Sequence, residues 1–182
     1  MFVYKCVYIS LNSFFSSRRS DCISKCSIVY FDYIQLLMYI RISFNIYNSL
    51  YEQEILAYPK LEVEKQPRFN KVYTKINNLL ESSETIVCGF SVKDDVGYLL
   101  DECERYECDP FQFKFYDIQR LAAKVSETKI NGLGAVYVEW CGRLADGAHR
   151  SDVDARYTYE VAKAICDKTK KKLINLFQEN EA

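Results

Sequence analysis

Several residues in the second half of the chain could bind a divalent cation or move a proton. Asp95 follows a short apolar run, Asp117 follows an alternating aromatic run, and the only histidine, His149, stands five residues before Asp154. Carboxylate oxygens are the ligands that Mg²⁺ prefers, and an imidazole can accept a proton near neutral pH. If the fold brings them together, these side chains could hold metal ions and activate a water molecule.

Asp95 and Asp154 each also have a structural interpretation. Asp95 stands at the head of an amphipathic stretch, where a carboxylate is favoured by the helix dipole. Asp154 is the last residue of Ser151-x-x-Asp154, which resembles a capping arrangement at the start of a helix. Both interpretations stay open beside the chemical one.

The periodicity of apolar residues predicts the elements that would position these side chains. Phe69, Val72, Tyr73 and Ile76 recur at helical spacing, while 85–90 is a short apolar run that ends near a glycine and is typical of a buried strand. Helices alternating with short buried strands predict an α/β layered domain. We expect helices over 69–80, 96–105, 119–125 and 153–177, a short amphipathic piece over 131–142, and strands over 85–90 and 111–116.

Two motifs add to this pattern. Gly89, Asp95 and Leu99 fit G-H-N-x-x-x-D-x-x-x-L, in which Phe90 and Ser91 stand in place of the His-Asn pair. His149, Asp154 and Ala155 fit H-x4-D-A completely, and the Asp117-Ile118 pair between the two motifs matches a strand that ends in Asp-Thr.

In this order, the motifs resemble those of the DEDDh (DnaQ-like) 3′–5′ exonuclease family of the RNase H-like superfamily, over residues 65 to 168. The resemblance implies an RNase H-like exonuclease fold with a mixed central sheet flanked by helices. It implies single-stranded DNA or RNA 3′ ends as substrate and two Mg²⁺ or Mn²⁺ ions as cofactors.

The same resemblance assigns roles to residues of the site. Asp95 and Asp154 would be metal ligands, and His149 would be the general base that takes the proton from the attacking water. Phe90 and Ser91 would face the substrate, where Phe90 either stacks on a base or packs against the protein.

The first motif of the family, a strand that ends in D-x-E, is not found. No glutamate precedes residue 52. In one register Asp32 follows a strand-like run and could be a metal ligand, but Ile34 stands where the glutamate belongs. In a second register Ser10 and Asn12 replace both acids. Either way the chain lacks the carboxylate pair that bridges both ions, so we expect exonuclease activity to be impaired.

The first fifty residues differ in composition from the rest. They contain no Glu, Gly, Ala, Pro or Thr, whereas a folded domain normally uses Gly and Pro to separate its elements. We therefore divide the chain into an atypical segment over 1–50, with degenerate or misread first strands, and an exonuclease-like domain over 51–182. A pair of strands rich in Tyr and Ile is one explanation; translation of AT-rich DNA outside the true frame, or divergent rebuilding, is the other.

The net charge, the apolar stretches and the cysteine spacing argue against some classes of function. A net charge of −1 gives no global signature of nucleic-acid binding. The most apolar stretch, 28–46, is interrupted by Asp32, Gln35 and Arg41, so no membrane span is expected. The eight cysteines form no CxxC pair and are expected to be free thiols in a cytoplasmic protein.

The alternative to an impaired nuclease is a catalytically inactive exonuclease-fold module that binds nucleic acid or a protein partner.

Overall fold

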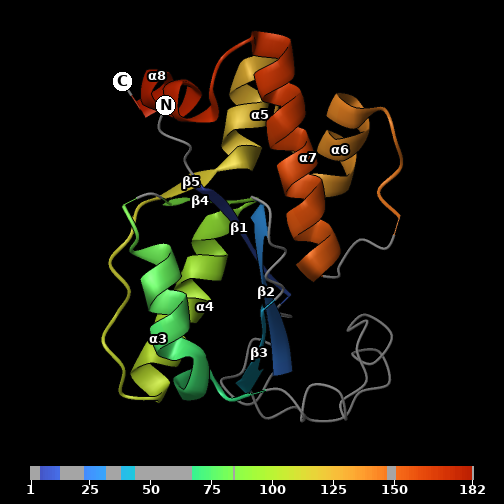
Figure 1. Cartoon of the computed structure of the whole chain (residues 1–182). Coiled ribbons are helices and arrows are strands. Elements are labelled where there is room, and N and C mark those ends of the chain that lie inside the picture. The colour runs from blue at the N-terminus through green and yellow to red at the C-terminus, as the bar shows by residue number, and fades with distance from the viewer. Residues whose placement is uncertain are drawn as a thin grey trace.

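The structure is a computed structural model of the whole chain. It describes the backbone of residues 5–12, 23–31, 38–43, 67–83, 85–146 and 151–181, and the side chains of 67–83, 85–146 and 153–179. The described part forms a central sheet with helices on both faces (Figure 1).

The sheet has five strands in the order β3-β2-β1-β4-β5. The strands are β1 (Lys5–Asn12), β2 (Ile23–Phe31), β3 (Met38–Ser43), β4 (Thr85–Gly89) and β5 (Phe115–Asp117). Strand β2 is antiparallel to both β1 and β3, whereas β4 is parallel to both β1 and β5. The expected mixed sheet is therefore confirmed, and β1 lies at its centre.

Two helices, α3 (Phe69–Leu80) and α4 (Val92–Arg105), bury a core against one face of the sheet. Side chains of a strand alternate between its faces, so Val87 of β4 points into this core while Ile86 and Cys88 point into the other. The core on this face consists of Phe69, Ile76, Leu80, Val87, Leu99, Cys103 and Phe111.

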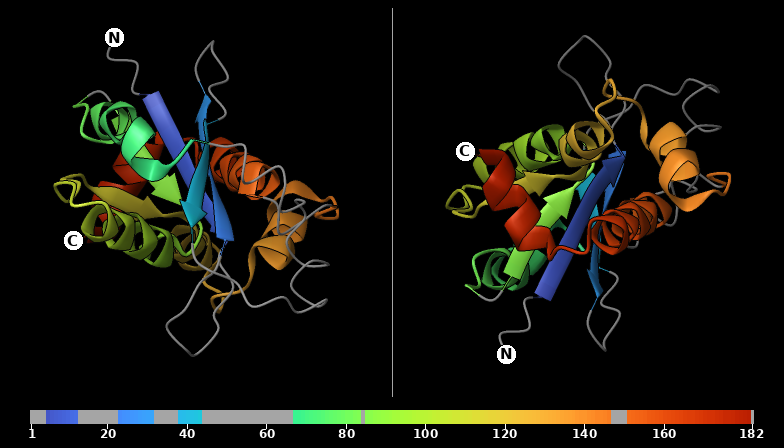
Figure 2. Two further views of the ribbon diagram at one scale, coloured as in Figure 1. Left: turned by 90° about the horizontal axis from the view of Figure 1, so that it is seen from below. Right: turned by 90° about the horizontal axis from the view of Figure 1, so that it is seen from above.

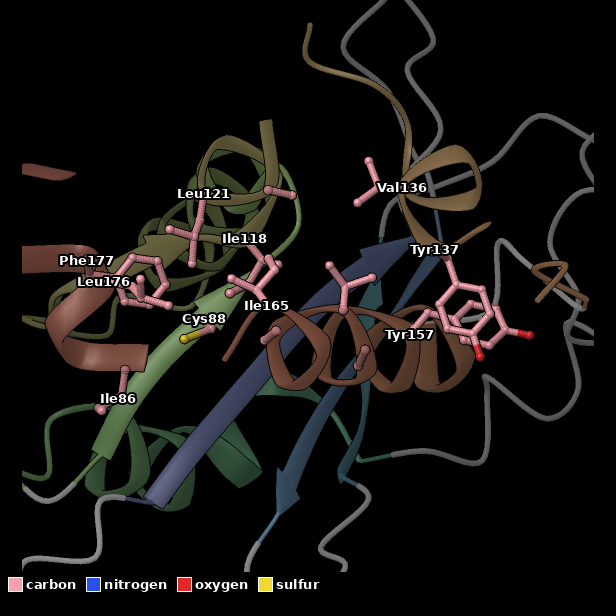
Figure 3. Close-up of a cluster of buried hydrophobic side chains, with 14 residues drawn as sticks. Ile86, Cys88, Ile118, Leu121, Val136, Tyr137, Tyr157, Ile165, Leu176 and Phe177 are labelled. Carbon is pink, nitrogen blue, oxygen red and sulfur yellow. The ribbon is translucent and has the colours of Figure 1, made fainter. Parts of the chain in front are cut away.

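The other face is covered by α5 (Ile118–Ser126), α6 (Leu133–Cys141), α7 (Ser151–Thr169) and α8 (Leu173–Glu181). Helix α7 packs across β1 and β2, as the further views in Figure 2 show. Figure 3 shows the core on this side: Ile118 and Leu121 of α5 and Phe177 of α8 meet near Cys88 of β4.

Helix α4 and strand β5 begin at other residues than expected. Helix α4 begins at Val92 rather than at residue 96, because Ser91 adopts a left-handed conformation (φ 57°, ψ 38°) that turns the chain straight from β4 into the helix. Strand β5 runs over Phe115–Asp117, whereas a strand over 111–116 was expected. The aromatic residues before it alternate because Phe111 and Phe113 pack against the α3–α4 core from an irregular segment.

The long C-terminal helix expected over 153–177 is two helices. Helix α7 ends at Thr169, and Lys170 adopts a left-handed conformation (φ 57°) before α8 begins at Leu173. The break lets α8 turn back over the sheet edge, where Phe177 stacks on Tyr116 with ring centroids 4.3 Å apart. Lys168 therefore lies in the last turn of α7, and the three lysines at 170–172 lie between the two helices.

Candidate functional site

The carboxyl ends of three parallel strands meet at one edge of the sheet. Ile9 of β1 pairs with Gly89 of β4, and Gly89 pairs with Asp117 of β5. The last residues of β1, up to Asn12, run past this register. In an open sheet with parallel strands, this edge is where ligands are generally bound. The edge brings together the backbone of the second-motif turn, Asp117 and the end of β1.

The second motif forms the connection from β4 into α4. Gly89 is buried, Ser91 makes the left-handed turn, and Asp94 and Asp95 fall in the first turn of the helix. Asp95 is only 8% exposed, which is unusual for a carboxylate. A carboxylate at a helix N-terminus is favoured by the helix dipole, which fits the position of Asp95 in the first turn of α4.

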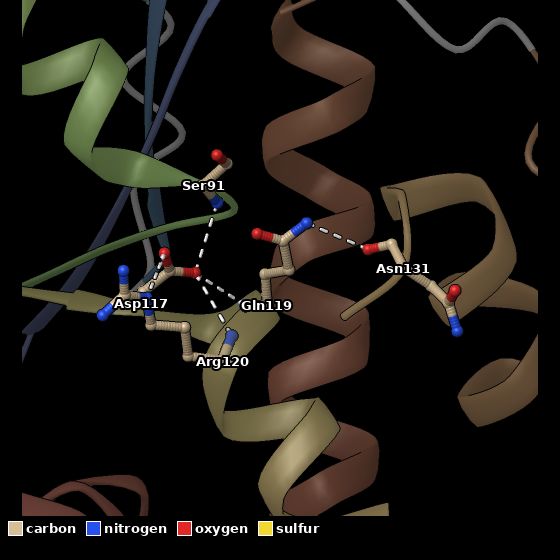
Figure 4. A network of polar contacts seen from close by, with 5 residues as sticks. All are labelled: Ser91, Asp117, Gln119, Arg120 and Asn131. Atoms are coloured by element: carbon tan, nitrogen blue, oxygen red, sulfur yellow. Dashed lines mark hydrogen bonds and ion pairs between the residues drawn. The ribbon is translucent and has the colours of Figure 1, made fainter. Parts of the chain in front are cut away.

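Asp117 holds the edge together (Figure 4). Its Oδ1 accepts hydrogen bonds from the backbone N–H groups of Gln119 (2.8 Å) and Arg120 (3.4 Å), which caps α5, and from that of Ser91 (3.2 Å). Arg120 Nε lies 3.9 Å from Oδ2. Asp117 therefore fixes the second-motif turn to the start of α5, and its Oδ1 is occupied by structural hydrogen bonds.

Asp154 lies in the first turn of α7. Its side chain is half-buried, and its backbone carbonyl accepts a hydrogen bond from Thr158 Oγ1 at 2.8 Å. Figure 3 places Tyr157, one turn further along α7, on the side of the sheet where the arrow of β1 ends. Because α7 also packs against β1, the start of α7 lies beside the carboxyl end of that strand.

The segment before α7 is anchored at its described end. The Tyr157 hydroxyl donates to the backbone carbonyl of Asp146, and the Tyr157 ring packs on Tyr137 with centroids 4.1 Å apart. Glu160 accepts from the Tyr137 hydroxyl and from Arg143, each at 2.6 Å. Burial is the main cause that raises the pKa of Tyr137 to about 12, so its hydroxyl remains a donor at every physiological pH.

The candidate residues are thus only partly described. Asp95, Asp117 and Asp154 lie on elements that reach this edge of the sheet. His149 and Asp32 lie outside the described residues. Phe90 is half-buried and packs against the core under α5 and α7. Its neighbour Ser91 is exposed.

The strand register bears on the two alternatives for the first motif. Strand β2, which precedes Asp32, runs antiparallel to β1 and ends with Phe31 beside Cys6, near the start of β1. That is the opposite end of the sheet from Gly89. Ser10 and Asn12, in contrast, belong to the last residues of β1, at the same end as Gly89 and Asp117. The topology favours the register in which Ser10 and Asn12 take the first-motif positions.

The side chains that the structure describes do not by themselves form a site for two divalent ions. Among the side chains that the structure describes, no three His, Cys, Asp or Glu residues gather as a group that could hold a metal ion. Mg²⁺ binds through carboxylate oxygens, and the two positions at the end of β1 are occupied by an alcohol and an amide. Among the described side chains, the carboxylates of Asp95 and Asp154 are the candidate ligands.

Comparison with known proteins gives matches among solved structures but none by sequence. No protein-family model matches the sequence, and no curated protein is similar enough in sequence to match. Solved structures match strongly: the nuclease domain of 3′hExo, a DEDDh family member bound to rAMP, superimposes with a TM-score of 0.71 at 14% identity, over 90% of this chain and 92% of that one.

The chain has the fold of the DEDDh exonuclease domains.

Two further structures have this exonuclease fold. Escherichia coli exonuclease I in complex with a dA16 oligonucleotide matches with a TM-score of 0.71 and 13% identity, over 97% of this chain but only 42% of that enzyme. A 3′-exonuclease described as recognising the histone mRNA stem-loop matches with a TM-score of 0.66 and 13% identity, over 93% of this chain and 83% of that one. The described helices of this exonuclease-fold chain include none long and apolar enough to cross a membrane.

Sequence reasoning missed two features of the exonuclease fold in this chain. One is Glu102, a fully buried acid on α4; its spacing of seven residues from Asp95, two helical turns, signals that both face inward. The other is a pocket beside β5 that gathers residues from four elements. No local pattern in the sequence could have revealed the pocket.

Proposed function

We propose that this protein binds the 3′ ends of single-stranded nucleic acid in an exonuclease fold, and that its phosphodiester hydrolysis is weak. The observation that carries the proposal is the register of β1: Ser10 and Asn12 run to the sheet edge where Gly89 and Asp117 end their strands. The edge keeps the backbone frame of a DEDDh exonuclease but has neutral residues where a carboxylate pair would hold the ions.

The substrate class rests on likeness of fold and on motif order. Two of the similar structures were solved with rAMP and with dA16, and the third is described as recognising the histone mRNA stem-loop. In this chain His149, Asp154 and Ala155 keep the complete H-x4-D-A motif. Nothing in the described residues distinguishes DNA from RNA, so both belong in the test.

Asp95 and Asp154 are the residues that would hold a divalent ion, Mg²⁺ or Mn²⁺, and a bound ion would neutralise charge on the phosphate. Two carboxylates on separate helices are a sparse set for even one such ion, because hard cations are usually held by several oxygen ligands. We therefore expect weak metal affinity. His149, as a general base, would accept a proton from the attacking water.

A second candidate function is a catalytically inactive module that binds nucleic acid or a protein partner. It is favoured by the same two residues, since an alcohol and an amide supply no negative charge to a cation. The two candidates differ in whether any metal-dependent release of nucleotides remains.

The decisive experiment restores the missing acids. Single-stranded DNA and RNA carrying a 5′ label would be incubated with Mg²⁺ or Mn²⁺ and with three proteins: the unaltered chain, the double variant Ser10→Asp/Asn12→Glu, and that variant with the further change Asp154→Asn. We expect little release by the first, stepwise shortening from the 3′ end by the second, and none by the third. Isothermal titration with Mn²⁺ should show tighter binding only in the double variant.

Two outcomes would contradict the proposal. Robust metal-dependent degradation by the unaltered chain, lost on His149→Ala, would mean that other residues complete the site. A folded double variant that binds Mn²⁺ tightly and still releases nothing would mean that the family's chemistry is not carried by this edge. Activity of the unaltered chain that is weak but abolished by Asp154→Asn would favour the impaired nuclease over the inactive module.

A further inference from the structure

A pocket of about 400 Å³ lies beside the edge strand β5, next to the candidate site, with which it shares Asp117. Its size is within the range of pockets that bind small ligands. The residues that characterise it come from α4, β5, α5 and α8: Lys93, Phe115, Tyr116, Arg120, Lys124 and Phe177.

The pocket concentrates positive charge. Lys93, Arg120 and Lys124 line it, and all three are exposed. Arg120 and Lys124 are four residues apart on α5, so they lie on the same side of that helix. The one acid in the lining, Asp117, uses its Oδ1 for backbone hydrogen bonds, and its Oδ2 lies 3.9 Å from Arg120 Nε, so Lys93 and Lys124 supply most of the excess positive charge. In a protein with a net charge of −1, three cations around one acid form a local site for an anion.

The pocket also presents aromatic rings. Successive residues of a strand point to opposite faces, but β5 is the last strand of the described sheet, so both Phe115 and Tyr116 reach the pocket around its edge. Tyr116 is held by stacking on Phe177, at 4.3 Å and 18°. Phe115 is 36% exposed, a large value for an apolar ring. Its ring is therefore accessible to a planar partner.

Cations interleaved with exposed rings are the combination that binds single strands, because lysines and arginines contact phosphates while bases stack on the rings. The pocket is also joined to the second-motif turn. Asp117, in its wall, accepts a hydrogen bond from the Ser91 backbone N–H at 3.2 Å, and Lys93 stands two residues before Asp95. Strand β5 is two strands from β1, which corresponds to about 10 Å.

We infer that this pocket, which nothing in the catalytic motifs requires, is a second binding site for the single strand: it holds phosphates and one base a few nucleotides upstream of the 3′ end. The inference rests on the proposed function for the identity of the strand. The pocket would then fix how the strand crosses the sheet edge, from β5 toward β1.

The test measures binding of fluorescein-labelled dA12 and A12 by anisotropy, in EDTA so that no cleavage occurs, over a range of salt concentrations. The pocket variant is Lys93→Gln/Arg120→Gln/Lys124→Gln. The matched control is Lys71→Gln/Lys75→Gln/Lys163→Gln, which removes the same charge from exposed positions on α3 and α7. Circular dichroism establishes that both variants are folded.

Each lost phosphate contact on a single strand lowers the slope of log affinity against log salt by about 0.7, so three lost contacts should lower it by about 2. If the proteins converge at 1 M salt, the pocket variant should bind about 100-fold more weakly at 0.1 M salt. The control variant should keep almost the original slope, because its three lysines lie outside the pocket. Phe115→Ala should weaken binding about tenfold with the slope unchanged, because it removes stacking only.

The possible failures are distinguishable. If the unaltered chain binds the strands and both triple variants lose the same small amount, the pocket is not a strand site, while the proposed function stands. If dAMP or inorganic phosphate competes as well as dA12, the pocket holds a mononucleotide or a free phosphate, respectively, and the inference of a strand path is wrong. If the unaltered chain binds no strand at any salt concentration, the proposed function fails and the inference fails with it.

Discussion

Glu102 on α4 is a buried acid whose cost to the fold can be measured. Its side chain is completely inaccessible to solvent, and neither carboxylate oxygen has a hydrogen bond. Arg105 Nε approaches Oε1 at 3.3 Å as an ion-pair partner. Burial raises the pKa of Glu102 from 4.5 to about 7, against the smaller opposite effect of Arg105. The folded protein thus holds the Glu102 proton more tightly than the unfolded chain does.

The sign of the resulting pH dependence follows from proton binding. Below about pH 4.5 the Glu102 carboxyl is protonated in both states and costs nothing extra. Between pH 4.5 and 7 the unfolded chain loses the proton first, so the free energy of unfolding falls as the pH rises. With each pKa unit corresponding to 1.36 kcal/mol, the total loss is about 3 kcal/mol, and it is complete above about pH 7.

Glu102→Gln removes the titrating group while it keeps the shape of the side chain. Urea unfolding followed by circular dichroism at pH 4.5, 6, 7 and 8 gives the free energy of unfolding of both proteins. The difference between them, variant minus wild type, should increase by about 3 kcal/mol from pH 4.5 to 8. A buried amide without partners adds a constant cost, which the comparison across pH cancels.

Two controls make the result specific. Glu104→Gln, at an exposed position two residues further along α4, should leave the pH dependence almost unchanged. Arg105→Gln should steepen the loss of stability with pH, because it removes the cation that favours the charged form of Glu102. A difference between Glu102→Gln and wild type that is constant with pH, or that shrinks as the pH rises, would refute the assignment of a raised pKa.

Three further predictions concern the candidate edge of the sheet. Ser91→Gly should stabilise the fold by about 1 kcal/mol, since Ser91 has φ 57° and glycine adopts that conformation without the Cβ penalty. A loss of stability in urea unfolding would mean that the Ser91 hydroxyl stabilises the folded protein. Asp117→Ala should cost about 2 kcal/mol, because it removes the α5 cap and the link to Ser91. Unfolding curves that coincide with wild type would argue against this role. Tyr157→Phe should cost about 1 kcal/mol and speed amide hydrogen exchange in the segment ending at Asp146, and unchanged exchange there would show that the hydroxyl is not what holds it.

The elements of the second half were predictable because local spacing alone defines them. Apolar residues at helical intervals gave 69–80 as α3, and the short run after 85 gave β4. Boundaries that depend on a single backbone conformation were not predictable. Ser91 and Lys170 are ordinary polar residues, and nothing in their types indicates that each adopts the left-handed region and so begins α4 or ends α7.

The two registers of the first motif could not be separated from the sequence. The segments before Asp32 and around Ser10 are both short runs rich in Ile, Val and Tyr, so each satisfies the local pattern of a strand. Only pairing with β4, far along the chain, identifies β1 as the parallel central strand. The pocket beside β5 could not be predicted for a related reason, because its cations and rings come from elements that are separate in the sequence.

The place of β1 has a consequence for how the chain becomes folded. One edge of β1 pairs with β2, which is close in sequence. The other edge pairs with β4, where the partner of Cys6 is Ile86, about 80 residues later in the chain. Contacts between such distant residues slow folding. During synthesis a chain that ends before residue 85 would carry the future centre of the sheet as an open edge, which can pair with other chains. Fragments lacking β4 should therefore aggregate. Strand β1, which carries the neutral residues Ser10 and Asn12 at the candidate site, would then also lower the yield of folded protein.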